Sequence, residues 1–167
     1  LYLNSMKKLY LLFFAMLCTG MLNAQIYSED FESYNVNDYM GVVNPTYWST
    51  WSNAPGTSED VRVTSANASS GTKSIYFSST AGGPQDVLLK FGSQYTSGKF
   101  TFEGDFLVTT GKKGYFNFQA TPVAGATWAL DVNMNGGNIS MGGNASGSYP
   151  EGAWFTLKIE ANLTLGA

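Results

Sequence analysis

The sequence predicts an all-β fold, an antiparallel sandwich of two sheets, and three observations support this prediction. Short segments rich in Val, Ile, Phe, Tyr, Trp and Thr recur along the chain, and these residue types favour strands. Clusters of Gly, Asn, Ser and Pro separate the segments, which is typical of turns between short antiparallel strands. After residue 25, apolar residues do not follow helical spacing for more than about one turn.

Ten segments qualify as strands, and so many in one piece of chain predict two packed sheets, as in a sandwich or jelly roll. In chain order they cover residues 26–31, 47–51, 61–64, 74–78, 86–91, 98–109, 114–120, 127–133, 138–141 and 154–161. The Asn135-Gly136 pair between two of these segments is the strongest hairpin signal. The polar stretch 142–148 is predicted to be a loop.

Alternation of apolar and polar residues is clearest in segment 98–109. One predicted face carries Phe100, Phe102, Gly104 and Phe106, and the other carries Thr101, Glu103 and Asp105. Segment 154–161 alternates in the same way, so Phe155, Leu157 and Ile159 are expected to face the core.

Residues 6–24 have the three parts of a Sec signal peptide: Lys7-Lys8, an apolar run over 9–18 and a polar, small-residue end. The apolar run is shorter than the roughly 20 residues that a membrane helix needs, so we expect cleavage between Ala24 and Gln25. The mature chain is therefore expected to have no membrane span and to be secreted, either outside the cell or on its surface.

The remaining segments set the domain boundaries. Residues 1–5 precede the signal's own methionine and are expected to be a non-native upstream stub. Residues 25–167 suit a single domain. The chain stops directly after segment 154–161, whose inward face still needs a neighbour, so we expect a C-terminally truncated sandwich followed by further domains.

Composition excludes several classes of chemistry. The chain has no His, which removes Ser-His-Asp and Cys-His catalysis and zinc sites that contain His. The only cysteine, Cys18, lies in the signal, so the mature chain cannot form disulfides. Nine basic residues against twelve acidic ones, without a basic run, indicate that nucleic acid is not a partner.

The order of several motifs along the chain is more specific than its composition. These motifs are Glu29-Asp30-Phe31-Glu32, Trp48-Ser49-Thr50-Trp51, Ser70-Gly71-Thr72-Lys73, Thr96-Ser97-Gly98-Lys99-Phe100, Gly114-Tyr115-Phe116-Asn117-Phe118-Gln119 and Trp154-Phe155-Thr156-Leu157. Together they resemble the concanavalin A-like (laminin G/MAM-type) jelly rolls of secreted proteins from Bacteroidetes and flavobacteria. The resemblance implies a two-sheet jelly roll, and it implies export by the type IX secretion system, although the sorting domain for that route is absent here.

Members of that family include lectins, carbohydrate-binding modules, adhesion domains and glycoside hydrolases, so the fold alone does not choose a function. The laminarinase-like hydrolases place three carboxylates at alternate positions of one strand. Glu103 and Asp105 match the first two, but Leu107 stands at the third, so the acid–base partner is missing. We therefore expect no enzymatic activity.

Calcium is the one metal expected, as a structural ion, because it accepts carboxylate and carbonyl oxygens. By the same resemblance, Glu29, Asp30 and Glu32 near the mature N-terminus are its candidate ligands. The alternative is that these acids only solubilise an exposed first strand.

Sugar binding needs exposed aromatic rings beside amide or carboxylate groups, and the candidates are Trp48, Trp51, Tyr115, Asn117 and Gln119. Trp48 and Trp51 are three residues apart, so on a strand they face opposite sides. Tyr115, Asn117 and Gln119 share one face, opposite Phe116 and Phe118. The alternative is that this face is ordinary surface.

The favoured hypothesis is a non-catalytic extracellular recognition module that binds a polysaccharide or cell-surface glycan within a larger secreted protein. A structural or adhesive spacer without sugar binding is a second hypothesis, and the residues do not separate the two. A laminarinase-like hydrolase is the third.

Overall fold

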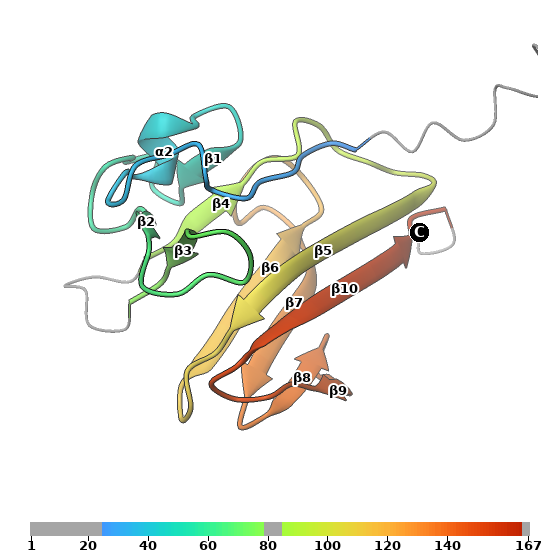
Figure 1. Ribbon diagram of the computed structural model, residues 1–167. Coiled ribbons are helices and arrows are strands. Elements are labelled where there is room, and N and C mark those ends of the chain that lie inside the picture. The colour runs from blue at the N-terminus through green and yellow to red at the C-terminus, as the bar shows by residue number, and fades with distance from the viewer. Residues whose placement is uncertain (1–24, 79–84, 165–167) are drawn as a thin grey trace, which may run out of the picture.

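The computed structural model describes residues 25–78 and 85–164, and almost all of its regular structure is β (Figure 1). The elements are helix α2 (Met40–Val43) and strands β1 (Trp48–Thr50), β2 (Arg62–Thr64), β3 (Ser74–Tyr76), β4 (Val87–Leu89), β5 (Lys99–Leu107), β6 (Lys113–Gln119), β7 (Trp128–Asn135), β8 (Asn138–Met141), β9 (Asn144–Ser148) and β10 (Trp154–Asn162). The all-β prediction is confirmed. The predicted stub and signal peptide lie outside the described residues.

Among the described residues, all strand pairs are antiparallel and the strands form four sheets. The two main layers are the β10–β5 pair and the four-stranded sheet β6–β7–β8–β9. In Figure 1, β5 and β10 run in front of β6 and β7, while α2 and strands β1 to β3 gather beside these long strands, at the upper left of the view. The smaller sheets are the pairs β1–β4 and β2–β3.

The main core lies between the two layers and is rich in phenylalanine. Phe102 and Phe106 of β5 face Phe116 and Phe118 of β6, and the rings of Phe106 and Phe116 stack with their centroids 5.5 Å apart. Behind these rings, the buried part of the cluster contains Val108, Val132, Met134, Ile139, Tyr149, Leu157 and Ile159. The predicted inward faces of β5 and β10 are therefore confirmed.

A second, smaller core lies in the N-terminal part and surrounds the buried side chains of Met40, Val61 and Val63. Beside it, the carboxylate of Asp60 is buried and accepts hydrogen bonds from the backbone N–H groups of Gly41, Gly56 and Val61 at 2.8–3.2 Å. Several charge-assisted bonds of this kind satisfy a buried carboxylate. Asp60 thus fastens the segment around α2 to the start of β2.

The predicted first strand at 26–31 is wrong, because its backbone groups are engaged locally. Oε1 of Glu29 accepts hydrogen bonds from the backbone N–H groups of Asp30 and Phe31, at 3.1 and 2.9 Å. Phe31 then takes a positive φ of 64° and the chain turns. A side chain that bonds its own backbone competes with strand pairing in this way.

The predicted loop at 142–148 is also wrong, since residues Asn144–Ser148 form β9 at the edge of the four-stranded sheet. All five side chains of β9 are exposed, so the segment has no apolar face that alternation could reveal. Its backbone pairs with β8, and a short polar edge strand is one way in which proteins end a sheet.

Candidate functional site

The outward side of strands β6, β7 and β8 carries most of the predicted ligand-binding residues. Antiparallel pairing places Tyr115 opposite Asn133, Asn117 opposite Asp131, and Gln119 opposite Trp128. The residues between them, such as Phe116 and Val132, point into the core. We call this surface the amide face, and it consists of the side chains of Lys113, Tyr115, Asn117, Gln119, Trp128, Asp131, Asn133, Asn135, Asn138 and Ser140.

A chain of hydrogen bonds runs along the centre of the amide face. The hydroxyl of Tyr115 donates to Oδ1 of Asp131 at 2.7 Å, and Nδ2 of Asn117 donates to the Tyr115 oxygen at 3.1 Å. Nε2 of Gln119 donates to Oδ1 of Asn117, and the backbone N–H of Gly125 donates to Oε1 of Gln119 at 3.1 Å. These bonds hold the side chains in one arrangement before any ligand binds, which lowers the entropy cost of binding.

The hydrogen bond between Tyr115 and Asp131 also fixes which of the two groups is the donor. It raises the pKa of the Tyr115 hydroxyl, with smaller contributions from burial and from the charges of Asp131 and Asp86. Tyr115 therefore stays protonated at neutral pH and donates to the carboxylate.

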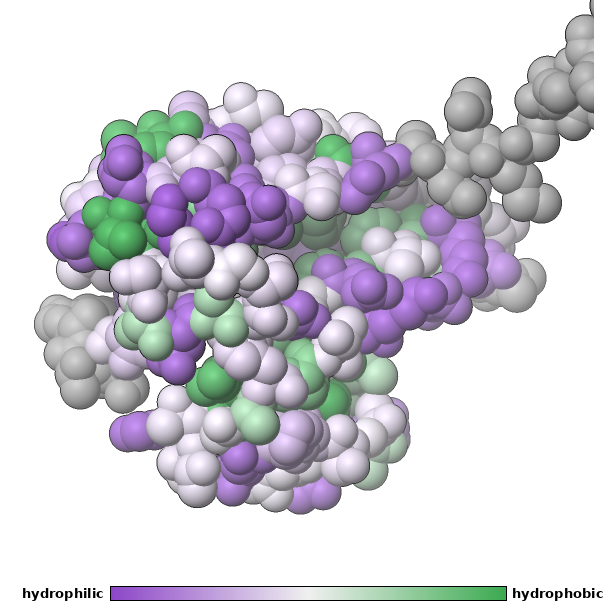
Figure 2. Space-filling model, in the orientation of Figure 1, coloured by the Kyte–Doolittle hydropathy of each residue, from purple (hydrophilic) through white to green (hydrophobic). Residues whose placement is uncertain are grey.

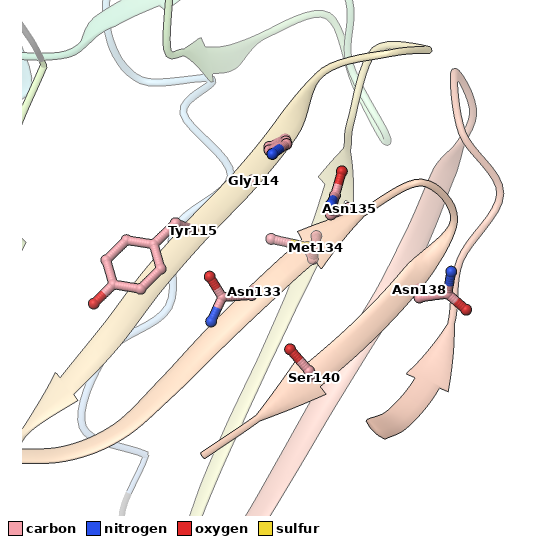
Figure 3. Close-up of a pocket in the computed structure, with 8 residues that line it drawn as sticks. Gly114, Tyr115, Asn133, Met134, Asn135, Asn138 and Ser140 are labelled. Atoms are coloured by element: carbon pink, nitrogen blue, oxygen red, sulfur yellow. The ribbon is translucent and has the colours of Figure 1, made fainter. Parts of the chain in front are cut away.

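A shallow hollow of about 510 Å³ lies at one end of the amide face (Figure 3). The β7–β8 hairpin predicted at Asn135-Gly136 forms this end, and Gly136 and Gly137 take φ values of 57° and 78° in its two-residue turn. Residues from three neighbouring strands line the hollow: Lys113, Gly114, Tyr115, Asn133, Met134, Asn135, Asn138 and Ser140. Its polar lining consists mainly of amide and hydroxyl groups, which both donate and accept hydrogen bonds.

Aromatic rings lie on the amide face and beside its other end. The side chains of Tyr115 and Trp128 are 53% and 56% exposed. Trp51, 37% exposed, comes from β1's C-terminal side and packs against the turn that carries Gly125. A Cβ at Gly125 would lie 2.9 Å from Cζ2 of Trp51, so this close approach depends on glycine.

Trp48 lies away from the amide face. Only 6% of it is exposed, and its indole Nε1–H donates to the hydroxyl of Tyr27 at 2.7 Å. Trp48 is therefore the buried ring of the pair, and Trp51, which directly follows β1, is the more exposed one. Asp131 and Asn133 were not among the predicted site residues, although they alternate with the apolar residues Leu130 and Val132 in the sequence.

The three candidate calcium ligands are engaged with separate partners. Oε2 of Glu29 accepts from the hydroxyls of Tyr27 and Tyr34, at 3.0 and 2.7 Å. Asp30 accepts from the backbone of Glu32, while the Glu32 carboxylate accepts from the backbone and the hydroxyl of Thr72. Within 25–78 and 85–164, no group of three acidic, His or Cys side chains is placed to hold a metal ion. The calcium site remains a prediction.

Glu103 and Asp105 are exposed on the outward face of β5. The Asp105 carboxylate accepts hydrogen bonds from the hydroxyls of Ser69 and Thr156, at 2.6 and 2.7 Å. The hydroxyl of Ser69, followed by that of Thr156, holds the pKa of Asp105 below its usual value. Glu103 lies opposite Lys158 in the β5–β10 pair. An acidic side chain opposite a basic one is typical of a solvated strand face. The absence of enzymatic activity remains a prediction.

Comparisons with known proteins find no matching family model, no matching curated protein and no matching solved structure. The concanavalin A-like resemblance therefore remains a prediction from the sequence motifs. No helix among the described residues has the length and apolar character that crossing a membrane requires.

Proposed function

We propose that this protein is a non-catalytic extracellular recognition module that binds a polysaccharide or cell-surface glycan on its amide face. In this proposal it is a concanavalin A-like jelly roll, exported by the signal at residues 6–24, and part of a larger secreted protein. The observation that carries the proposal is the hydrogen-bonded set of Tyr115, Asn117, Gln119 and Asp131 beside the exposed ring of Trp128.

The chemistry of this surface suits sugar hydroxyls. Each hydroxyl both donates and accepts a hydrogen bond, and amide side chains offer the same two functions. The apolar faces of sugar rings can pack on exposed aromatic rings, which gain from the burial of their surface. From Tyr115 to Gln119 the face extends about 13 Å along β6, at roughly 3.3 Å per residue, so it presents its groups in a row rather than at one point.

The test is binding of the exported chain, from residue 25 onward, to a panel of polysaccharides by affinity gel electrophoresis. We expect Trp128→Ala and Tyr115→Ala each to weaken retention by about tenfold or more, which corresponds to about 1.4 kcal/mol. Tyr76→Ala is the matched control, because Tyr76 is 57% exposed but lies on β3, outside the amide face. Retention by this variant should not change.

The same gels, run with calcium and again with a chelator, separate the ligand-binding prediction from the calcium prediction. Loss of binding with the chelator would show that a calcium ion takes part. A folded protein that no polysaccharide retains would overturn the proposed function and favour a structural or adhesive spacer. Release of sugar from a retained polysaccharide would instead favour the hydrolase alternative.

A further inference from the structure

The charge distribution of the amide face is uneven. Asp131 carries a carboxylate at the centre, and the charge of Asp86 also acts on the Tyr115 hydroxyl beside it. The cationic side chain of the face, Lys113, lies at the hollow, four residues along β6 from Asn117. Four residues of strand span about 13 Å, and the two side chains form no ion pair. Lys113 therefore offsets the charge of Asp131 less than a directly paired cation would.

The hydrogen-bonding capacity of Asp131 also favours a ligand that donates hydrogen bonds over an anionic one. An ionised carboxylate only accepts hydrogen bonds and has about four lone-pair sites. Tyr115 donates to Oδ1, which leaves acceptor capacity for a donor on the ligand. A sugar hydroxyl can supply that donor, whereas a carboxylate or sulfate group on a sugar is itself only an acceptor and carries a like charge.

We propose that the amide face selects neutral glycans, and that Asp131 is the specificity-determining residue that disfavours chains carrying carboxylate or sulfate groups. This inference rests on the proposed function, because it concerns the ligand of the same face. Like charges a few ångströms apart on a protein surface change binding by roughly tenfold at low salt, and salt screens the effect.

The experiment compares each neutral polysaccharide with its own sulfated derivative, so that the backbone is constant and only the charge differs. Xylan, galactomannan and mixed-linkage β-glucan are the probes, in gels at about 20 mM and about 1 M salt. We expect the wild type to be retained roughly tenfold more strongly by the neutral form at low salt, with a smaller ratio at high salt.

Two variants locate the source of the discrimination. Asp131→Asn keeps an oxygen that can accept from Tyr115 but removes the charge, so we expect it to lower the ratio of neutral to sulfated binding at low salt. Glu160→Gln removes the same charge from the outward face of β10, in the other layer of the sandwich, and should leave the ratio unchanged.

Three outcomes would overturn the inference, and they differ from failure of the proposed function. Equal or stronger low-salt retention of the wild type by sulfated forms would overturn neutral selection while glycan binding stands. An equal fall in the ratio for Asp131→Asn and Glu160→Gln would assign the selection to the overall charge. An unchanged ratio for Asp131→Asn would remove this residue as the determinant. If folded protein binds neither form of any probe, the proposed function fails, and the inference fails with it.

Discussion

The two outward faces of the sandwich differ in how their polar groups are satisfied. We call the outward side chains of β5 and β10 the charged face: Lys99, Thr101, Glu103, Asp105, Thr156, Lys158 and Glu160. There, Glu160 forms ion pairs with Lys99 and Lys158 at 2.8 and 3.2 Å. Figure 2 shows hydrophilic side chains along these two strands. The amide face has one carboxylate at its centre, with amides and aromatic rings around it.

This difference indicates which face is suited to a ligand. Charges that pair with their neighbours are already compensated and well hydrated, so a ligand gains little by displacing them. Covering exposed aromatic rings with a ligand lowers the free energy, and amide side chains that are already held in place lose little conformational entropy on binding. Both faces lie on the same phenylalanine core, so the contrast comes from the outward residues alone.

The largest expected effect tests whether one core supports both faces. Phe116→Ala removes a ring that contacts Phe102, Phe106 and Phe118, and we expect the free energy of unfolding to fall by about 3 kcal/mol. Tyr115→Ala, at the next position of β6 but facing outward, should cost less than about 1 kcal/mol. Urea denaturation followed by tryptophan fluorescence measures both values. Equal losses would show that Tyr115 is part of the stability core rather than a surface group.

The same contrast explains how much of the molecule the sequence predicts. The faces of β5, β6 and β10 follow from alternation within single strands, so Tyr115, Asn117 and Gln119 could be placed on one surface in advance. Local turn chemistry likewise predicts the hairpin at Asn135-Gly136. In contrast, β9 has exposed side chains throughout and owes its pairing to β8, so its own residues carry no signal.

The other half of the amide face depends on information that lies outside any single strand. Asp131 and Trp128 join the face through the register of β6 with β7, including an irregularity between Phe118 and Gln119. Trp51 directly follows β1, which belongs to a separate sheet, and it packs on Gly125. Pattern within a segment fixes which way a side chain points, but only tertiary pairing fixes which side chains meet.

A smaller effect is expected at acid pH, on the charged face. Hydrogen bonds from the hydroxyls of Ser69 and then Thr156 lower the folded-state pKa of Asp105. A carboxyl whose pKa is lower in the folded state stabilises the protein above its unfolded-state pKa, about 3.9 for Asp. This stabilisation is lost as the pH falls through the lowered pKa. The thermal midpoints of wild type and Asp105→Asn should therefore differ at pH 7 and converge as the pH falls through the lowered pKa of Asp105.

Glu103→Gln is the control for this pH dependence, because Glu103 lies two residues away on the same face. Its midpoint should differ little from that of the wild type at either pH. A difference for Asp105→Asn that stayed constant from pH 7 down to the lowest pH at which the protein folds would contradict the assignment to the Asp105 carboxylate.

The smallest expected effect concerns the ion pairs of the charged face. Glu160→Gln removes the carboxylate that pairs with both Lys99 and Lys158. Exposed pairs of this kind are weak and are screened by salt, so we expect a loss in the free energy of unfolding at low salt that is smaller than either effect above. At about 1 M NaCl, where the Debye length is roughly 3 Å, the difference should vanish. Urea denaturation at the two salt concentrations measures this. A loss that persists at high salt would mean that Glu160 stabilises the strand pair by packing, and that the charged face is more than a solvated surface.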